Sequence, residues 1–236
     1  MIQEQPIPVF DWFSNQFTVE GRAESLAHLG PHLVPLIRPG DRVLDLCCGA
    51  GGVSFFLEEQ GAQVTGIDLA PGLIALAREE ANKRPSQASF SQGNVLTQGL
   101  GSGEYDLVVC LGNPIVDFPH EQFSRFRDKV HQALKPAGRL AVEYRDGVLR
   151  FLAMSDPEEV VEEGATGQIV RRFKEYDPEL GAYKAEYRHL TSGETYEARG
   201  YLYTGPMIHM MMEAAFELES SVRLSESGFL DVYRKR

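Results

Sequence analysis

The sequence predicts an α/β fold, in which helices cover both faces of a mostly parallel sheet. Apolar runs that suit buried strands, such as residues 42–47 and 105–111, alternate with amphipathic segments that suit helices. A glycine turn, Gly49 to Gly52, joins the first of these runs to a helix. Alternation of this kind gives parallel strands that are connected by right-handed crossovers.

The elements of the first half follow in a regular order. Residues 10–37 carry an apolar face with helical spacing, and Pro39-Gly40 ends this segment before the first strand. The expected elements are two short helices within 10–37, strands at 42–47, 62–67, 88–91, 105–111 and 138–144, and helices at 52–60, 74–83 and 120–134.

The pattern changes after residue 144. Residues 156–163 are acidic and predict a surface helix. Three β-rich runs, separated by the turns DPELG and TSGE, then predict an antiparallel meander at 168–176, 182–190 and 195–203. We expect this insert to form a lid over a functional site or half of a dimer interface. The tail, with a Met-rich helix at 206–215 and strands at 216–224 and 228–234, is expected to return to the edge of the main sheet.

The glycine turn and two aspartates predict a nucleotide-type site. Gly49 and Gly51 let the backbone turn sharply and approach a ligand, and the helix that follows presents its N-terminal N–H groups to it. Asp68 ends the second strand about 20 residues later, where an acidic side chain accepts hydrogen bonds from ribose hydroxyls.

Asp45 distinguishes between the ligands that such a turn binds. A carboxylate immediately before the glycines would repel the pyrophosphate of a dinucleotide. A ligand with a cationic amino group and a sulfonium tolerates that charge well, so the residues favour S-adenosylmethionine (SAM). A NAD-dependent oxidoreductase is disfavoured further, because the sequence has no Tyr-x-x-x-Lys or equivalent group.

The segment VLDLCCGAGG resembles the first motif of the class I SAM-dependent methyltransferases, with Cys47 where the family often has its first glycine. Further segments resemble the family in the same order: VTGIDLAPGLIALARE, FSQGNVL, YDLVVCLGN and LKPAGRLAVEY. The resemblance covers residues 35–145. It implies a Rossmann-like mixed seven-stranded sheet, with the last strand antiparallel and helices on both faces, in addition to the inserted antiparallel β-meander.

The division expected from these patterns has three parts. Residues 1–40 form an N-terminal helical cap, and residues 41–146 together with 206–236 form the SAM-binding core. Residues 147–205 form the inserted β subdomain.

The resemblance also implies roles for single residues. Asp45 would orient the methionine amino group, Asp68 would hold the ribose, and Asn94 would read the adenine amine with its acceptor oxygen. The product S-adenosylhomocysteine is expected to bind the same residues. The expected cofactor-binding residues are Asp45, Cys47, Gly49, Gly51, Asp68, Leu69, Asn94, Val95 and Leu111.

The acceptor is predicted from the segment that follows the fourth strand. Asn113-Pro114 begins the sequence NPIV, which lacks the second proline and the aromatic residue of the N-P-P-aromatic motif of adenine and glutamine methyltransferases. The run LGN resembles small-molecule methyltransferases better, glycine-type N-methyltransferases among them. We therefore expect a small-molecule acceptor with an N or O nucleophile. A non-catalytic SAM-binding regulator, and an enzyme that acts on a protein or nucleic-acid amine, remain as alternatives.

Several side chains are candidates for acceptor binding or proton transfer, and each also has a structural alternative. Tyr144 ends the fifth strand, and Arg145 beside it is suited to bind a carboxylate. His120 and His189 are further candidate bases. The catalytic candidates are Asn113, Tyr144 and His209, and the substrate-binding candidates are Trp12, Asn113, Arg145, Tyr201 and Tyr203.

Composition limits the class of protein. The chain has 236 residues, 43% of them hydrophobic, which is enough for a sizeable core. A net charge of −11 disfavours a nucleic-acid partner, since phosphate binding needs clustered Lys and Arg. No apolar run approaches a membrane span and the first residues resemble no signal peptide, so a cytoplasmic protein is expected. The three cysteines lack a C-x-x-C pair, so we expect reduced thiols and no metal. A homodimer is expected from the hairpin edges of the insert.

Overall fold

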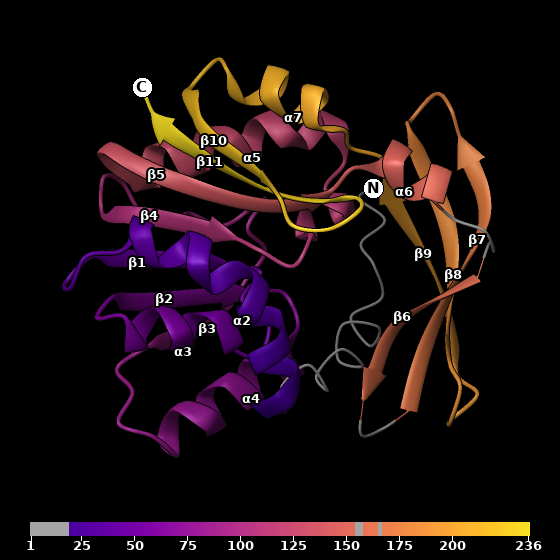
Figure 1. The fold of residues 1–236 in the computed structure, drawn as a ribbon, viewed down its shortest axis with the longest axis horizontal. Helices are drawn as coiled ribbons and strands as arrows, with labels where there is room; N and C mark the ends of the chain where they lie inside the picture. Colours follow the sequence, from indigo (N-terminus) through magenta and orange to yellow (C-terminus); the bar gives the residue numbers. More distant parts are fainter. Residues whose placement is uncertain (1–18, 154–157, 165–166) are drawn as a thin grey trace.

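A computed structural model describes residues 19–153, 158–164 and 167–236, and Figure 1 shows its two β-sheets beside each other. The larger sheet has seven strands in the order β10-β11-β5-β4-β1-β2-β3. Its strands are β1 (Arg42–Leu46), β2 (Gln63–Asp68), β3 (Ser89–Gln92), β4 (Tyr105–Cys110), β5 (Leu134–Arg145), β10 (Phe216–Arg223) and β11 (Gly228–Lys235).

The pairing of these strands confirms the predicted fold class. β1 runs parallel to both β2 and β4, and β4 runs parallel to β5. β11 is antiparallel to its two neighbours, β5 and β10. The sheet is therefore the mixed, Rossmann-like one with an antiparallel last strand. The chain moves outward from β1 to β3 and then returns to the other side of β1, so the strand order reverses between β1 and β4. In open α/β sheets a ligand binds at the carboxyl ends of the strands at such a point.

Helices cover both faces of this sheet. Successive residues of a strand point to opposite faces, so each face packs against its own set of helices. Leu44 and Leu46 pack in the cluster that contains Phe123 of one helix, whereas Val43 packs in a second cluster with Leu33 of another. The helices are α2 (Val19–Leu33), α3 (Gly52–Glu59), α4 (Pro71–Asn82), α5 (His120–Ala133), α6 (Gly147–Ala153) and α7 (Gly205–Met212), with short 3₁₀ helices η2 (Val34–Leu36) and η3 (Pro114–Asp117).

The insert forms a separate antiparallel sheet of four strands in the order β6-β7-β8-β9. The predicted meander corresponds to β7 (Gly167–Asp177), β8 (Ala182–His189) and β9 (Thr195–Tyr201). Along β8, residues 183, 185, 187 and 189 are buried and residues 184 and 188 are exposed, so one face of the strand covers a core as its alternation predicts. β6 and β9 are the edges of this sheet, and a homodimer through them remains a prediction.

The prediction of a helix at residues 156–163 is wrong. Glu158–Gly164 is strand β6, paired antiparallel with β7 so that Glu158 lies opposite Arg172. Glu158 also forms an ion pair with Arg188 of β8, with 3.1 Å between Arg188 Nη2 and Glu158 Oε1. Acidic residues on this edge therefore meet basic residues of the neighbouring strands, and cross-strand pairing decided the conformation.

The N-terminal cap is only partly described. α2 corresponds to the second helix predicted within residues 10–37, whereas the first helix and Trp12 lie outside the described residues. In the part of the chain that the structure describes, no helix is both long and apolar enough to cross a membrane.

Candidate functional site

The glycine turn after β1 is held against the end of β2. The N–H of Gly49 donates to Asp68 Oδ2 over 2.8 Å, and the N–H of Cys48 donates to the carbonyl of Ile67 over 3.1 Å. Gly49 has a φ of +56°, and a side chain at Gly49 or at Gly52 would meet no atom within 4 Å. The turn therefore leaves its backbone open to a ligand at the edge where the strand order reverses.

Gly51 serves a different purpose in the same turn. Its φ is +87°, and a Cβ there would lie 2.9 Å from Cζ of Phe90 and 3.1 Å from Cε2 of Phe55. These two buried rings pack edge to face with centroids 5.4 Å apart, so they have little room to move. The close approach of helix α3 to the sheet depends on the missing side chain.

We expect Gly51→Ala to destabilise the protein more than Gly40→Ala does. Gly40 has a similar φ of +90°, but a Cβ there would meet nothing within 4 Å. Gly40→Ala should cost only the left-handed conformation, about 1–2 kcal/mol, whereas Gly51→Ala should add about 1–3 kcal/mol from overlap with the rings. Urea unfolding measures both free energies. Equal losses in the two variants would contradict this account of the turn.

Asp68 organises the region around the turn. Its side chain is buried at the end of β2, where Oδ2 accepts the Gly49 N–H and Oδ1 accepts the N–H of Ala70 over 2.9 Å. Ala70 precedes α4, so one carboxylate holds both the glycine turn and the start of that helix. The structure thus places Asp68 beside the turn, as the sequence predicts.

Asp45 lies near the carboxyl end of β1, and only 2% of it is exposed. The hydroxyl of Ser54, on α3, donates to Asp45 Oδ2 over 2.6 Å. Burial raises the pKa of Asp45 to about 7, the Ser54 hydrogen bond opposes this, and the charge of Asp68 adds to it. The carboxyl group therefore titrates near neutral pH, and a cation bound beside it would favour its ionised form.

The remaining cofactor candidates follow the same edge of the sheet. Leu69 is half-buried directly after β2, and Leu111 is buried directly after β4. Asn94 follows β3, but its Oδ1 accepts the N–H of Leu96 over 2.8 Å and closes a local turn. Val95 is buried in the main core. The side chain of Val95 therefore packs in the core next to this edge. The acceptor oxygen of Asn94 already accepts a hydrogen bond from within the protein.

Cys47 continues the main chain of the turn in the left-handed conformation, with a φ of +59°. It is half-buried and packs against the main core. The hydrogen bond with the thiol of Cys110 has the largest effect on the pKa of Cys47, and burial has the second largest. Both raise it. Cys47 is therefore a protonated thiol at neutral pH, next to the end of β4.

The segment after β4 is joined to the end of β5. The N–H of Gly112 donates to Glu143 Oε2 over 2.8 Å, and Asn113 Oδ1 accepts the N–H of Arg145, also over 2.8 Å. Burial raises the pKa of Glu143, against the opposing effects of the Gly112 N–H and the charge of Arg145. Asn113 has a φ of +66°, which turns the chain at this point into the short helix η3.

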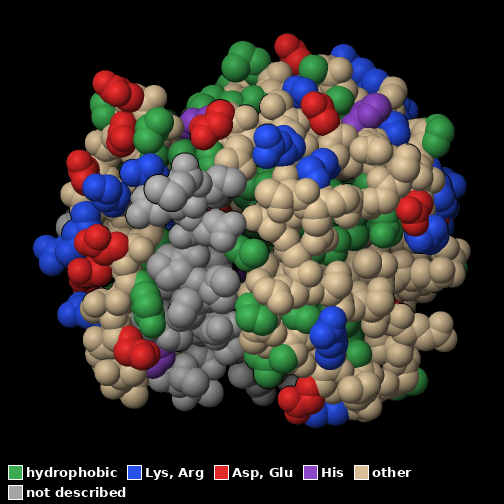
Figure 2. All heavy atoms as spheres, turned by 180° about the vertical axis from the view of Figure 1, so that it is seen from behind, with side chains coloured by type: hydrophobic (Ala, Val, Ile, Leu, Met, Phe, Trp, Pro, Cys, Tyr) green, Lys and Arg blue, Asp and Glu red, His purple; other side chains and the backbone are tan. Residues whose placement is uncertain are grey.

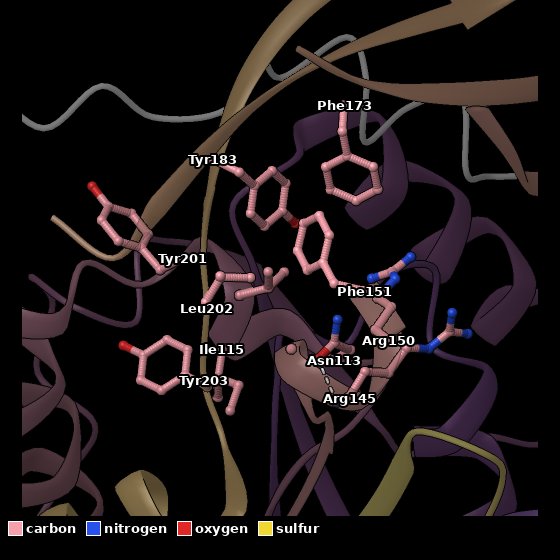
Figure 3. A pocket seen from close by; sticks show the side chains of 12 residues that line it. Asn113, Ile115, Arg145, Arg150, Phe151, Phe173, Tyr183, Tyr201, Leu202 and Tyr203 are labelled. Atoms are coloured by element: carbon pink, nitrogen blue, oxygen red, sulfur yellow. Dashed lines mark hydrogen bonds between the residues drawn. The ribbon is translucent and has the colours of Figure 1, made fainter. Parts of the chain in front are cut away.

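A pocket opens directly beyond this turn, between the carboxyl edge of the larger sheet and the smaller sheet (Figure 3). Its volume is about 300 Å³, including the space at its mouth. Four predicted substrate-binding residues meet here, although they come from distant parts of the chain. The lining residues are Asn113, Ile115, Val116, Arg145, Gly147, Arg150, Phe151, Phe173, Tyr183, Tyr201, Leu202 and Tyr203.

Three aromatic rings form one wall of the pocket (Figure 3). The ring centroids of Phe151 and Phe173 are 4.7 Å apart, those of Phe173 and Tyr183 are 4.9 Å apart, and those of Phe151 and Tyr183 are 6.0 Å apart. The rings belong to α6, β7 and β8, so three separate elements of residues 147–205 build this wall together.

Tyr203 contributes its ring to the lining, but its hydroxyl is used elsewhere. The hydroxyl donates to the carbonyl of Phe118 over 2.7 Å, and burial raises the pKa of Tyr203 well above the ordinary value. His120 lies 2.9 Å from the carbonyl of Leu202 through Nε2, and its ring meets Tyr203 edge to face at 4.7 Å. Both residues fix the chain after β9 against the core.

The structure does not bring Tyr144 or His209 to the pocket. Tyr144 is 2% exposed and stacks on Phe229 at 5.6 Å; burial raises its pKa well above the ordinary value, and the charge of Asp231 adds to this. His209, on α7, lies 2.8 Å from Asp231 Oδ2 through Nε2. His189 accepts the N–H of Ser192 within a hairpin of the smaller sheet. None of these three side chains lines the pocket, so the physical setting of each favours a structural role.

Several pocket residues are absent from the sequence predictions. Arg150 and Phe151 lie on α6, a helix that was not predicted, and Phe173 and Tyr183 lie in the insert. The sequence held one signal for Tyr183. A glycine inside a strand indicates that another group approaches the backbone closely. A Cβ at Gly200 would lie 2.4 Å from the hydroxyl oxygen of Tyr183.

Comparison with known proteins adds evidence of family. Residues 43–138 match the family model described as a methyltransferase domain. An uncharacterized methyltransferase of Synechocystis is 37% identical over 115 residues, which cover 47% of this chain and 52% of that protein. Rat glycine N-methyltransferase is 28% identical over 118 residues, which cover 44% of this chain and 40% of that protein. The chain thus spans about half the length of these curated relatives, or less.

Solved structures match almost the whole chain. The CcbJ methyltransferase from Streptomyces caelestis has a TM-score of 0.77 at 21% identity, covering 99% of this chain and 97% of that one. At this identity the similarity shows the fold, including the insert. Residues 43–138 carry the methyltransferase match as well as the glycine turn, Asp45 and Asp68. Through these residues the chain is similar to the methyltransferase domain family, and its fold is that of solved SAM-dependent methyltransferases.

Proposed function

We propose that this protein transfers the methyl group of SAM to a nitrogen or oxygen nucleophile of a small molecule bound between the two sheets. The observation that carries the proposal is the position of the pocket. Its lining begins at Asn113, immediately after Leu111 and Gly112, and the smaller sheet forms its far wall. The family resemblance implies that Leu111 and Gly112 border the transferred methyl group, so the pocket adjoins the reacting centre.

The edge of the larger sheet has room and charges that fit SAM. Gly49, Gly52 and Gly112 all face space that a Cβ could enter without meeting another atom within 4 Å. We assign Asp68 to accept the ribose hydroxyls and Asp45 to favour a cationic amino group. Both of these side chains are acidic, which suits SAM better than the pyrophosphate of a dinucleotide.

The side chains of the pocket act by binding and positioning. Bound SAM supplies an electrophilic methyl group on a sulfonium. Among the described lining residues there is no His, Asp or Glu, and the candidates for a general base among them are tyrosines. An acceptor that arrives as a neutral amine needs no base before the transfer. Holding the nucleophile at near contact and excluding water then provide the rate enhancement.

The lining of the pocket favours a small acceptor over a macromolecule. Aromatic and aliphatic side chains with a few polar groups form it, as is typical of small-molecule sites. The relative glycine N-methyltransferase has a name that denotes a small amino-group acceptor, which agrees with an amine here. A non-catalytic regulator would share the cofactor residues, and only a test of turnover separates it from an enzyme.

Calorimetric titration with SAM, S-adenosylhomocysteine and NAD tests the cofactor, and methyl-labelled SAM then tests turnover with a panel of amines, phenols and carboxylates. We expect SAM and its product to bind, NAD not to bind, and a labelled small molecule to form. SAM binding without transfer to any small molecule would instead support the regulator. Binding of NAD alone would contradict the proposed function.

A further inference from the structure

We infer that the carboxylate of Glu143 lies beside the transferred methyl group and binds the amino group of an amine acceptor. The inference rests on the proposed function, because it takes the carboxyl edge of the larger sheet as the place of methyl transfer. It adds the chemical class of the nucleophile, and it assigns a substrate-binding role to a residue that is absent from the sequence predictions.

A hydrogen bond holds Glu143 next to the end of β4. Glu143 lies near the carboxyl end of β5, which is the neighbour of β4 in the sheet. Its Oε2 accepts the N–H of Gly112 over 2.8 Å, and Gly112 follows β4 closely. The family resemblance implies that Leu111 and Gly112 border the transferred methyl group. The carboxylate of Glu143 is therefore next to the expected reacting centre.

Glu143 and Asp45 belong to the same face of the sheet. Asp45 lies opposite Val109 of β4, and Val109 lies opposite Ala141 of β5. Successive residues of a strand alternate between the two faces, so Glu143, two residues after Ala141, returns to the face of Ala141 and Asp45. Leu230, opposite Glu143 on β11, packs with Val109 and Ala141 in one apolar cluster. Only β4 separates β1 from β5 (Figure 1), so a ligand with its amino group at Asp45 can extend along this edge toward Glu143.

Open space adjoins the carboxylate. Gly112 has a φ of +84°, and a Cβ on it would meet no atom of the described residues within 4 Å. Glu143 itself is half-buried, so that its side chain is partly shielded from water without being enclosed. A ligand group can therefore approach it, and a charged hydrogen bond formed there is stronger than one in bulk water.

The carboxylate has accepting capacity left for a ligand. Within the described residues, its hydrogen-bond donor is the Gly112 N–H, and Arg145 acts on it through charge alone. Burial raises the pKa of Glu143 and these two groups oppose the rise, so the protein compensates the ionised form only in part. An ionised carboxylate accepts several hydrogen bonds, and an N–H group or a cation of a ligand would complete the compensation.

A negative charge at the reacting centre selects the kind of nucleophile. It repels a phenolate or a carboxylate, and it attracts an ammonium group. An alkyl amine with a pKa of about 10 reaches the protein mainly as ammonium. One N–H then donates to Glu143. A second N–H bond breaks, its electron pair stays on the nitrogen and its proton passes to water, so that the lone pair can face the methyl group.

Sinefungin tests the position of this charge without a known acceptor. In this analogue of SAM a carbon that carries an amino group replaces the methylated sulfur, whereas S-adenosylhomocysteine has no charge at that atom. Calorimetric titration of the full chain at pH 8, where Asp45 is ionised, measures both affinities. We expect Glu143→Gln to lower the preference for sinefungin about ten- to a hundredfold, as the loss of a charged hydrogen bond implies.

The affinity for S-adenosylhomocysteine separates the effect of charge from a structural effect. The side-chain oxygen of glutamine can still accept the Gly112 N–H, so Glu143→Gln should bind S-adenosylhomocysteine as the wild-type protein does. Glu143→Asp keeps the charge and should keep part of the preference for sinefungin. Glu58→Gln is the matched control. Glu58 accepts the N–H groups of Gln87 and Ala88, at 2.6 and 3.0 Å, at the opposite edge of the sheet, so its substitution should leave the preference unchanged.

Two results would overturn the inference and leave the proposed function intact. One is a ratio of the two affinities that is the same in the wild-type protein and in Glu143→Gln. The other is transfer of the label from methyl-labelled SAM to a phenol or a carboxylate of the panel while the amines stay unlabelled. Failure of the wild-type protein to bind SAM or S-adenosylhomocysteine would instead contradict the proposed function itself.

Discussion

Replacing Asp68 with alanine is expected to reduce SAM affinity by about two to four orders of magnitude. The substitution removes the acceptor of the Gly49 and Ala70 N–H groups, which lie 2.8 and 2.9 Å from the carboxylate. It also removes the carboxylate expected to accept the ribose hydroxyls. Hydrogen bonds to a charged group contribute about 1.5–3 kcal/mol each, and two of them account for the expected loss. Calorimetric titration with SAM measures it.

Asp106→Ala is the matched control for this variant. Asp106 also accepts a backbone N–H, from Arg42 at 2.9 Å, and forms an ion pair with Lys135 at 2.7 Å. It lies near the start of β4, at the opposite edge of the same sheet. We expect Asp106→Ala to bind SAM as the wild-type protein does. If Asp68→Ala retained the wild-type affinity, the placement of the ribose at Asp68 would be wrong.

SAM affinity is expected to fall as the pH is lowered through about 7, because Asp45 takes up a proton there. Burial raises the pKa of Asp45 to about 7. In the proposed role, only the ionised form would attract the amino group of SAM. An ordinary α-amino group has a pKa of about 8 and stays protonated as the pH falls. Below the pKa of Asp45 the affinity should therefore drop by up to about tenfold per pH unit.

Asp45→Asn is the test of this assignment. The variant keeps a polar group beside Ser54 but cannot ionise, so its SAM affinity should be low above pH 7 and nearly constant through neutrality. Titrations at a series of pH values measure both proteins. A wild-type affinity that changes no more with pH than that of Asp45→Asn would refute a direct role of the Asp45 charge.

The same group makes the stability of the SAM-free protein depend on pH in the opposite direction. The pKa of Asp45 is about 7 in the folded state against 3.8 for an ordinary aspartate, so between these values the folded state binds the extra proton. Its contribution to stability is fully present below the lower value and is lost as the pH rises through the upper one. Urea unfolding at acidic and at alkaline pH should show this loss in the wild-type protein, and Asp45→Asn should lack it.

The sequence by itself determined the unit from β1 to β2. Its strands are apolar runs, its turn is marked by glycines, and Asp68 follows at the distance that a helix and a strand require. These signals are local, because each depends on neighbouring residues and on the period of one element. The resemblance to a family then supplied the mixed seven-stranded sheet and its antiparallel last strand, which no local pattern specifies, and the strand order came from the structure.

Only the tertiary structure decided how the pocket between the two sheets is built. Its aromatic wall joins Phe151, Phe173 and Tyr183 from three elements, and nothing in the neighbourhood of each residue indicates the other two. β6 was predicted as a helix because acidic residues suit a helix surface, and its pairing with β7 made it a strand. His209 faces Asp231 rather than the pocket for the same kind of reason. Contacts between distant segments depend on how the insert packs on the core, and side-chain periodicity carries no record of that packing.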